Sequence, residues 1–161
     1  MTMIRPATAD DAAACAQIYA PVVTDTAVTF EYEPPSAEEL ARRIEAAHVW
    51  LVAVENDTVL GYAYGGPFAT RAAFARTCEV SVYLAPDARG KGLGRQLYTV
   101  LLERLRDNGL HVAISGIALP NDVSIALHTS FGFELVGIYR EVGHKFNQWH
   151  DLARYQLRLG D

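Results

Sequence analysis

The sequence predicts an α/β protein with one mixed, mostly antiparallel central sheet of about seven strands and about four helices on both faces of that sheet. The order strand, helix, strand, helix between residues 78 and 133 indicates a parallel crossover. Elsewhere, short strands separated by turn residues favour antiparallel pairing. The chain has 161 residues, half of them hydrophobic, and no linker interrupts it. We therefore expect a single domain over residues 1–161.

Helix start and stop residues mark the first part of the chain. Thr8, followed by Ala9-Asp10-Asp11, is a helix N-cap, and Pro21 is expected to end that helix. Ser36 and Glu39 form a capping box for the next helix. Residues 22–35 show no clear period, so we expect a loop or irregular helix beside a ligand pocket. In this part we expect a strand at residues 4–8 and helices at residues 12–19 and 36–47.

Two further strands are expected around the turn Asn56-Asp57, at residues 50–55 and 59–65, and Gly65-Gly66-Pro67 is expected to break the second. The most regular strand follows at residues 78–84. Its apolar side chains at positions 78, 80, 82 and 84 share the core face, and Glu79, Ser81 and Tyr83 share the polar face. We expect helices at residues 95–108 and 122–131 and strands at residues 112–119, 135–139 and 150–159.

A glycine-dense turn joins strand 78–84 to the helix that follows it. Glycines at positions 90, 92 and 94 let successive backbone N–H groups converge on one anion, and the helix adds its positive N-terminal dipole. Arg89, Lys91 and Arg95 add cations to a chain whose formal net charge is -5. The spacing fits neither a dinucleotide fingerprint nor a Walker A loop. The turn therefore predicts a cradle for the phosphate groups of another anionic ligand.

Composition excludes several classes of protein. No apolar run approaches the roughly 18 to 20 residues of a membrane span, and the N-terminus lacks the apolar core of a signal peptide. The acidic net charge, without a basic stripe and interleaved aromatics, argues against nucleic acid as a partner. Cys15 and Cys78 have no metal-ligand spacing, and we expect both to be buried, reduced thiols. These features favour a cytoplasmic protein without a metal site.

Arg89-x-x-Gly92-x-Gly94, placed between a strand and a helix, resembles the acyl-CoA signature of the GNAT superfamily of N-acetyltransferases. Further segments are similar to the branch that acetylates phosphinothricin, methionine sulfoximine and methionine sulfone: residues 61–68, 82–84, 97–98, 119–122 and 149–151. The resemblance runs from Ile4 to about Leu157. One motif departs from the branch, which usually has an aromatic residue and a glycine where this chain has His144 and Asn147. The resemblance implies the GNAT fold, acetyl-CoA as cosubstrate and a homodimer.

The resemblance also implies roles for individual residues. Glu79 matches the general base of the branch, Asn121 the residue that hydrogen-bonds the pantetheine arm, and His128 a catalytic histidine. The predicted cofactor-binding residues are Val82, Leu84, Arg89, Gly90, Lys91, Gly92, Gly94, Arg95, Asn121 and Ser124, and the predicted substrate-binding residues are Phe30, Arg71 and Tyr83.

Each of these roles has a structural alternative. A carboxylate on the polar face of strand 78–84 could accept a proton from an amine, but Glu79 could instead pair with Arg76. His128 could assist the leaving thiolate or simply contribute to packing. Arg71 could bind a carboxylate or phosphinate bidentately, or it could be a solvated surface charge. Phe30 could wall an apolar part of the site or belong to the core.

The function that these observations favour is acetyl-CoA-dependent N-acetylation of the α-amine of a small amino-acid-like substrate. Acetylation of a protein N-terminus or a polyamine is the alternative within the same chemistry. A non-catalytic acyl-CoA-binding module is the alternative outside it, and Glu79 argues against that module because binding alone needs no base.

Overall fold

The computed structural model describes residues 1–160. Seven strands form one sheet in the order β1-β2-β3-β4-β5-β7-β6, and all neighbours are antiparallel except β4 and β5. The strands are β1 (Met3–Pro6), β2 (Val49–Glu55), β3 (Thr58–Pro67), β4 (Thr77–Leu84), β5 (Val112–Ala118), β6 (Glu134–Lys145) and β7 (Gln148–Arg158). The helices are α1 (Ala12–Asp25), α2 (Ala37–Ala46), α3 (Leu93–Asp107) and α4 (Asp122–Ser130). The predicted fold class is confirmed.

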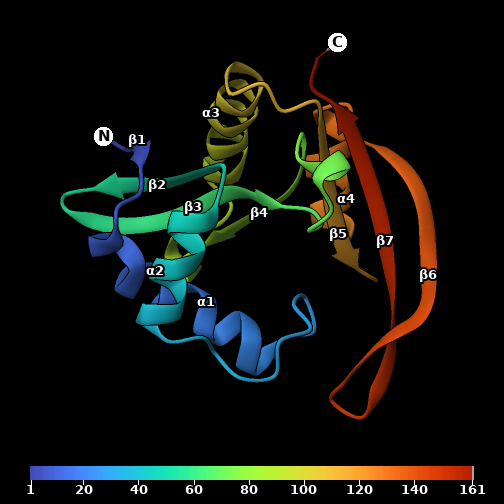
Figure 1. Cartoon of the computed structure of the whole chain (residues 1–161). Helices are drawn as coiled ribbons and strands as arrows, with labels where there is room; N and C mark the ends of the chain where they lie inside the picture. The colour runs from blue at the N-terminus through green and yellow to red at the C-terminus, as the bar shows by residue number, and fades with distance from the viewer. Residues whose placement is uncertain (161) are drawn as a thin grey trace.

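Alternation along β2 shows how the sheet separates two hydrophobic cores. Leu51 and Ala53 pack into the core that contains α3, whereas Trp50 and Val52 pack into the core that contains α1 and α2. Successive side chains of a strand point to opposite faces, so a strand buried on both faces needs an almost continuous apolar run. Figure 1 shows α1 and α2 on one side of the sheet and α3 on the other.

The capping signals of the N-terminal half are confirmed, but the end of the first helix is not. Thr8 accepts from the N–H of Asp10 at the short 3-10 turn that leads into α1, and Ser36 accepts from the N–H of Glu39 at α2. The predicted capping box at α2 is only half formed, because the Glu39 carboxylate accepts from Arg42 and Arg43 instead of from the Ser36 N–H. Pro21 lies inside α1, which continues to Asp25. Burial of Val22 and Val23 in the α1 core stabilises the extra turn against the loss of one backbone hydrogen bond at proline.

Two strands are longer than the sequence predicts. β3 continues through Gly65 and Gly66, because both residues stay paired with β4, opposite Val80 and Glu79. β6 continues to Lys145, and only Phe146 and Asn147 separate it from β7. Both of these turn residues have positive φ (53° and 59°), the conformation that a two-residue hairpin turn requires. The orange and red hairpin of β6 and β7 lies along the right-hand side of the molecule in Figure 1.

Candidate active site

A groove opens where β4 and β5 separate. These parallel strands pair only at Thr77–Glu79 with Val112–Ile114. Beyond Glu79 lie two cavities, one of about 490 Å³ beside the start of α3 and one of about 60 Å³ deeper between the strands. They share the lining residues Val28, Val82, Tyr83, Asn121 and Ser124. We call the two cavities together the β4–β5 groove.

The glycine-dense turn forms one end of this groove. Gly90 and Gly92 have φ of +75° and +80°, and a Cβ at either position would meet no atom within 4 Å. Gly92 is the N-cap of α3, a helix of 15 residues, so the unpaired N–H groups and positive dipole of its first turn lie here. Arg89 lines the groove on the same side. Exposed backbone N–H groups at the start of a helix can bind an anion such as a phosphate group.

The structure brings most of the predicted cofactor-binding residues into one wall. Val82, Leu84, Arg89, Gly90, Gly94, Arg95, Asn121 and Ser124 all line the larger cavity. Lys91 and Gly92 are exposed in the same turn but outside this lining. The Arg95 guanidinium donates to the Ser130 hydroxyl at 2.8 Å and lies 5.3 Å from the Phe131 ring centre, so it is directed toward α4.

Asn121 has a structural task that leaves part of its side chain available. It is the N-cap of α4, and its Oδ1 accepts from the N–H of Ser124 at 3.1 Å. Within residues 1–160 its side-chain nitrogen donates no hydrogen bond. The amide group can therefore donate into the groove while its oxygen holds the helix start.

Glu79 lies at the point where the two strands separate. Its carboxylate accepts from Nη1 of Arg154 on β7 at 3.1 Å, and its side chain is 42 % exposed. The alternative that pairs Glu79 with Arg76 is wrong, because Arg76 donates from Nε to the Gly109 carbonyl at 2.8 Å. A partly exposed ion pair contributes little stability, typically about 0 to 1 kcal/mol. The carboxylate can therefore exchange its partner with water or an amine at small cost.

His128 is buried, with both ring nitrogens in hydrogen bonds. Nδ1 lies 2.7 Å from the Ser124 carbonyl and Nε2 lies 2.9 Å from the Tyr98 hydroxyl. A carbonyl oxygen only accepts, so Nδ1 carries the proton and Nε2 accepts from Tyr98. Burial lowers the pKa of the imidazole. His128 is therefore held as a neutral ring at the wall of the small cavity.

Tyr98 is a site residue that the sequence analysis missed. It is fully buried on α3, lines the small cavity with Ser115, and donates to His128. Burial raises the pKa of this phenol far above its usual range, so Tyr98 stays protonated. Two sequence signals could have found it: its polar tip within the otherwise apolar stripe of α3, and its place in the segment 97–98 that is similar to the acetyltransferase branch.

The predicted substrate-binding residues do not all reach the groove. Tyr83 lines both cavities and packs against Tyr19, with ring centres 4.9 Å apart. Phe30 lies instead against Gly143, and Val28 from the same loop occupies the groove wall. Arg71 is exposed before the short 3-10 turn Ala72–Phe74 and lies outside the lining of both cavities.

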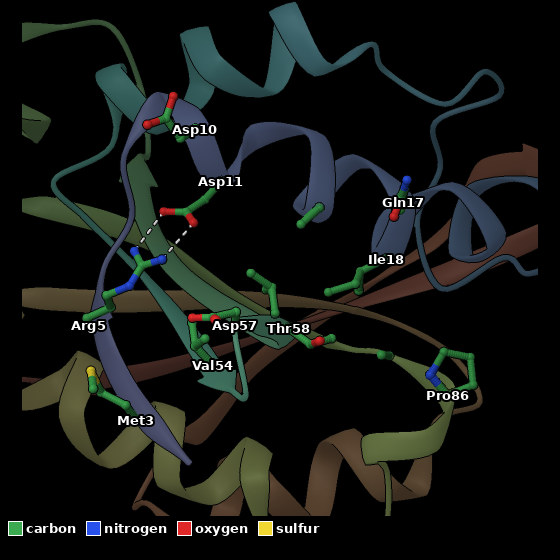
Figure 2. Close-up of a pocket in the computed structure, with 13 residues that line it drawn as sticks. Met3, Arg5, Asp10, Asp11, Gln17, Ile18, Val54, Asp57, Thr58 and Pro86 are labelled. Atoms are coloured by element: carbon green, nitrogen blue, oxygen red, sulfur yellow. Dashed lines mark hydrogen bonds and ion pairs between the residues drawn. The ribbon is translucent and has the colours of Figure 1, made fainter. Parts of the chain in front are cut away.

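A second cleft, of about 670 Å³, lies away from these residues (Figure 2). Its walls come from β1, α1 and the β2–β3 turn, and the Arg5 guanidinium donates to both carboxylate oxygens of Asp11 at 2.8 and 2.9 Å. Asp11 also accepts from the N–H of Thr8, and these contacts lower the pKa of its carboxyl. The buried charge of this cleft is thus neutralised internally.

Among residues 1–160, no three histidine, cysteine or acidic side chains gather as a metal-binding group. In the same residues, no helix combines the length and apolar character that a membrane crossing requires.

Known proteins share this sequence and architecture. The acetyltransferase (GNAT) domain family matches residues 4–153. The phosphinothricin N-acetyltransferase of Streptomyces coelicolor is 39 % identical, over 97 % of this chain and 95 % of its own. The L-methionine sulfoximine/L-methionine sulfone acetyltransferase of Salmonella typhimurium is 38 % identical, over 98 % of this chain and 95 % of its own.

Solved structures agree with the sequence relatives. An acetyltransferase of Salmonella typhimurium, solved with its cofactor acetyl-CoA, superimposes with a TM-score of 0.96 at 37 % identity. The superposition covers 100 % of this chain and 95 % of that one. On the domain match, the identities and the shared fold, this chain belongs to the GNAT family of acetyltransferases.

Proposed function

We propose that this protein transfers the acetyl group of acetyl-CoA to the α-amine of a small amino-acid-like substrate of the phosphinothricin, methionine sulfoximine or methionine sulfone type. The observation that carries the proposal is the β4–β5 groove, whose two cavities share lining residues and run from the glycine-dense turn at Gly90–Gly94 to the gap between the strands. Glu79 is the last β4 residue paired with β5 before this gap, and it lies outside the lining of both cavities. The names of the relatives from Streptomyces coelicolor and Salmonella typhimurium support this class of acceptor.

Acetyl-CoA, when bound, supplies an activated thioester, and the residues of the groove bind and orient it. The turn at Gly90–Gly94 holds the diphosphate through backbone N–H groups. The Asn121 amide donates to the pantetheine arm. Val82 and Leu84 line the groove on β4, whose edge has lost its β5 partner here and offers backbone groups to the same arm.

Glu79 removes the proton from the acceptor amine. An amino group with a pKa well above 7 is mostly protonated at neutral pH and cannot attack a carbonyl in that form. The Glu79 carboxylate is in contact with solvent and is held by a single ion pair, so it can accept the proton directly or through one water. Arg154 stays beside it and orients it.

His128 has an assisting role. A thiol leaving group has a pKa of about 8.5 by analogy with cysteine, so the thiolate departs without a strong acid. The neutral imidazole and the Tyr98 hydroxyl together present a polar, proton-bearing pair to the small cavity. The Tyr98 hydroxyl stabilises developing negative charge on sulfur by a hydrogen bond when it turns from Nε2 of His128 toward the small cavity. The imidazole, whose Nδ1 proton stays on the Ser124 carbonyl, positions that hydroxyl.

We further propose that the protein is a homodimer that works in the cytoplasm. β6 is an edge strand of the sheet and exposes four large apolar side chains, Leu135, Val136, Tyr139 and Val142. An exposed apolar edge strand is a surface for pairing with another chain. Light scattering after size exclusion tests this: we expect a dimer mass for the wild type and a monomer mass for Val136→Lys. The two cysteines, both buried free thiols, suit a reducing compartment.

The experiment that tests the function is a panel of acceptors with acetyl-CoA, read by release of free thiol. It contains free amino acids, their sulfone, sulfoximine and phosphinate analogues, the matching carboxyl amides, a peptide N-terminus and a polyamine. We expect the amino-acid analogues to react, and Glu79→Gln to abolish most of that rate without weakening acetyl-CoA binding. Preference for peptides or polyamines over every amino acid would contradict the proposed acceptor. Acetyl-CoA binding without acetylation of any amine would contradict catalysis.

A further inference from the structure

One wall of the β4–β5 groove is a loop rather than a strand or a helix. Residues 26–32 follow α1, and Val28 from this loop lines both cavities opposite Val82 and Tyr83. We call residues 26–32 the wall loop. A loop wall needs fixed anchors if the groove is to keep one shape.

The outer end of the wall loop is anchored to α2 and α1. The Arg43 guanidinium donates to both oxygens of Glu31 at 3.0 and 2.7 Å. The Tyr19 hydroxyl also donates to Glu31 and accepts from Thr29. These contacts come from helices that are near in sequence, and they lower the pKa of the Glu31 carboxyl.

The inner end is anchored from the other end of the chain. The last four carbonyls of a helix have no partner within the helix, and α1 has no basic residue in its last turn. The Thr26 hydroxyl donates to the Val22 carbonyl at 2.6 Å. The Val23 carbonyl accepts from Nζ of Lys145 at 2.6 Å, and the same Nζ donates to the Thr29 carbonyl at 2.9 Å. One ammonium therefore joins the end of α1 to the wall loop.

Lys145 is specialised for this contact. The residue is 5 % exposed, and within residues 1–160 no carboxylate forms an ion pair with it. A buried charge without a counter-ion is costly, and here two carbonyls and the negative end of the α1 dipole stabilise it. Burial lowers the pKa of the ammonium, an effect that the negative charge of Glu31 opposes.

Neighbouring contacts join the same two segments. The Phe30 ring occupies the space that a Cβ of Gly143 would need, 2.5 Å away. The Tyr32 hydroxyl donates to the His144 carbonyl. His150 donates from Nε2 to the carbonyl of Lys145 at 2.9 Å, which fixes the backbone from which the lysine extends. Three consecutive residues of β6, at positions 143–145, thus hold the wall loop.

We propose that Lys145 is a positioning residue for the acetyl-transfer groove: it binds the Val23 and Thr29 carbonyls and so holds Val28 opposite Tyr83. The kinetic part of this inference rests on the proposed function, whereas the structural part does not. If Lys145 only stabilised the β6–β7 hairpin, its loss would lower Tm but would leave the affinity of the groove for acetyl-CoA unchanged at a temperature where the protein is folded.

Lys145→Met tests the proposal, because methionine keeps an unbranched apolar side chain and removes both hydrogen bonds. We expect hydrogen exchange of the backbone amides of residues 26–32 to rise at least about tenfold, since a charged hydrogen bond contributes roughly 1.5 to 3 kcal/mol. We also expect the Kd for acetyl-CoA to rise about tenfold on the same basis. Arg140→Met is the matched control on the same strand, because Arg140 forms an exposed pair with Asp151 and does not contact the wall loop.

Tyr32→Phe is the second variant and removes only an exposed contact with β6. We expect a smaller rise in exchange at residues 29–32 in a normally folded protein. The proposal is overturned if Lys145→Met folds and leaves exchange and acetyl-CoA affinity unchanged, or if Tyr32→Phe, which keeps both Lys145 hydrogen bonds, raises exchange at residues 26–32 as much as Lys145→Met does. If the wild type acetylates no amine, the proposed function fails, but exchange and acetyl-CoA affinity still decide the role of Lys145.

Discussion

Gly92→Val separates the two tasks of the glycine-dense turn, backbone conformation and anion binding. Gly92 has φ of +80°, and a Cβ there would meet no protein atom within 4 Å. The substitution therefore creates no clash within the protein. It places a branched side chain in the left-handed region, and in the proposed cradle that side chain occupies the space through which a phosphate group would approach the backbone N–H groups.

Gly109→Val is the control that measures only the stability cost of a side chain at positive φ. Gly109, just beyond the other end of α3, has φ of +82° and equally open surroundings. A left-handed L-residue costs roughly 1 to 2 kcal/mol, and more for a β-branched one. In a domain of this size 1 kcal/mol corresponds to about 2 to 4 °C in Tm. Both variants should therefore lose at least about 2 to 8 °C.

Only Gly92→Val should also lose acetyl-CoA affinity. Losing one charge-assisted hydrogen bond to phosphate costs roughly 1.5 to 3 kcal/mol, or about ten- to a hundredfold in Kd. Isothermal calorimetry at 15 °C, with folding confirmed by circular dichroism, measures this difference. Equal Kd values for folded Gly92→Val and wild type would refute the cradle, whatever happens to Tm.

Three other results are expected. Glu79→Gln should lower kcat by about 10² to 10⁴, the usual loss for a general base, with unchanged acetyl-CoA affinity; wild-type turnover from pH 6 to 9 would rule out the base. Arg71 is exposed and lies outside the lining of both cavities, so Arg71→Ala should leave KM for amino-acid acceptors nearly unchanged. A rise of about ten- to a hundredfold, with poor rescue by Arg71→Lys, would show instead that its guanidinium binds the acceptor. Burial lowers the pKa of His128 in the folded state, whereas an unfolded histidine keeps its ordinary pKa of about 6.5. As the pH falls below about 6.5, the unfolded state therefore takes up a proton before the folded state does. The free energy of unfolding falls as a result, by up to about 1.4 kcal/mol per pH unit. Urea unfolding should show that the free energy of unfolding falls less from pH 7.5 to pH 5.5 in His128→Gln than in the wild type. Equal falls in the two proteins would count against a neutral buried imidazole.

Local sequence was sufficient for most of the elements and for the conformation of the glycine-dense turn. Caps such as Ser36, the alternation of residues 78–84 and the glycines at 90 and 92 act over a few residues, and the structure confirms each of them. The end of α1 was wrong because burial of Val22 and Val23 outweighs the local effect of Pro21. The full length of β6 was missed because most of its residues are exposed on both faces, which leaves no alternation to detect.

Partners across the fold were beyond the sequence analysis. Whether Glu79 meets Arg76 or Arg154 depends on which strand follows β5 in the sheet, and pairing of β5 with β7 decides for Arg154. Tyr98 and His128 lie on different helices, and only their packing over the β4–β5 gap joins them. Arg71 was chosen for its place between two core strands and its fit to the family, and Phe30 for its residue type, but neither lines the groove.

The contact of Lys145 also has a consequence for the order of folding. Its two hydrogen bonds join residues 122 and 116 positions apart, which are among the longest sequence separations in the protein. Contacts that close such long loops form late, because their entropy cost must be met before they contribute. We expect the wall loop to remain unstructured until the β6–β7 hairpin docks. A ribosome-bound chain that ends before residue 145 would then have the glycine-dense turn but no complete groove, so the capacity to bind acetyl-CoA would appear only after Lys145 has been synthesised.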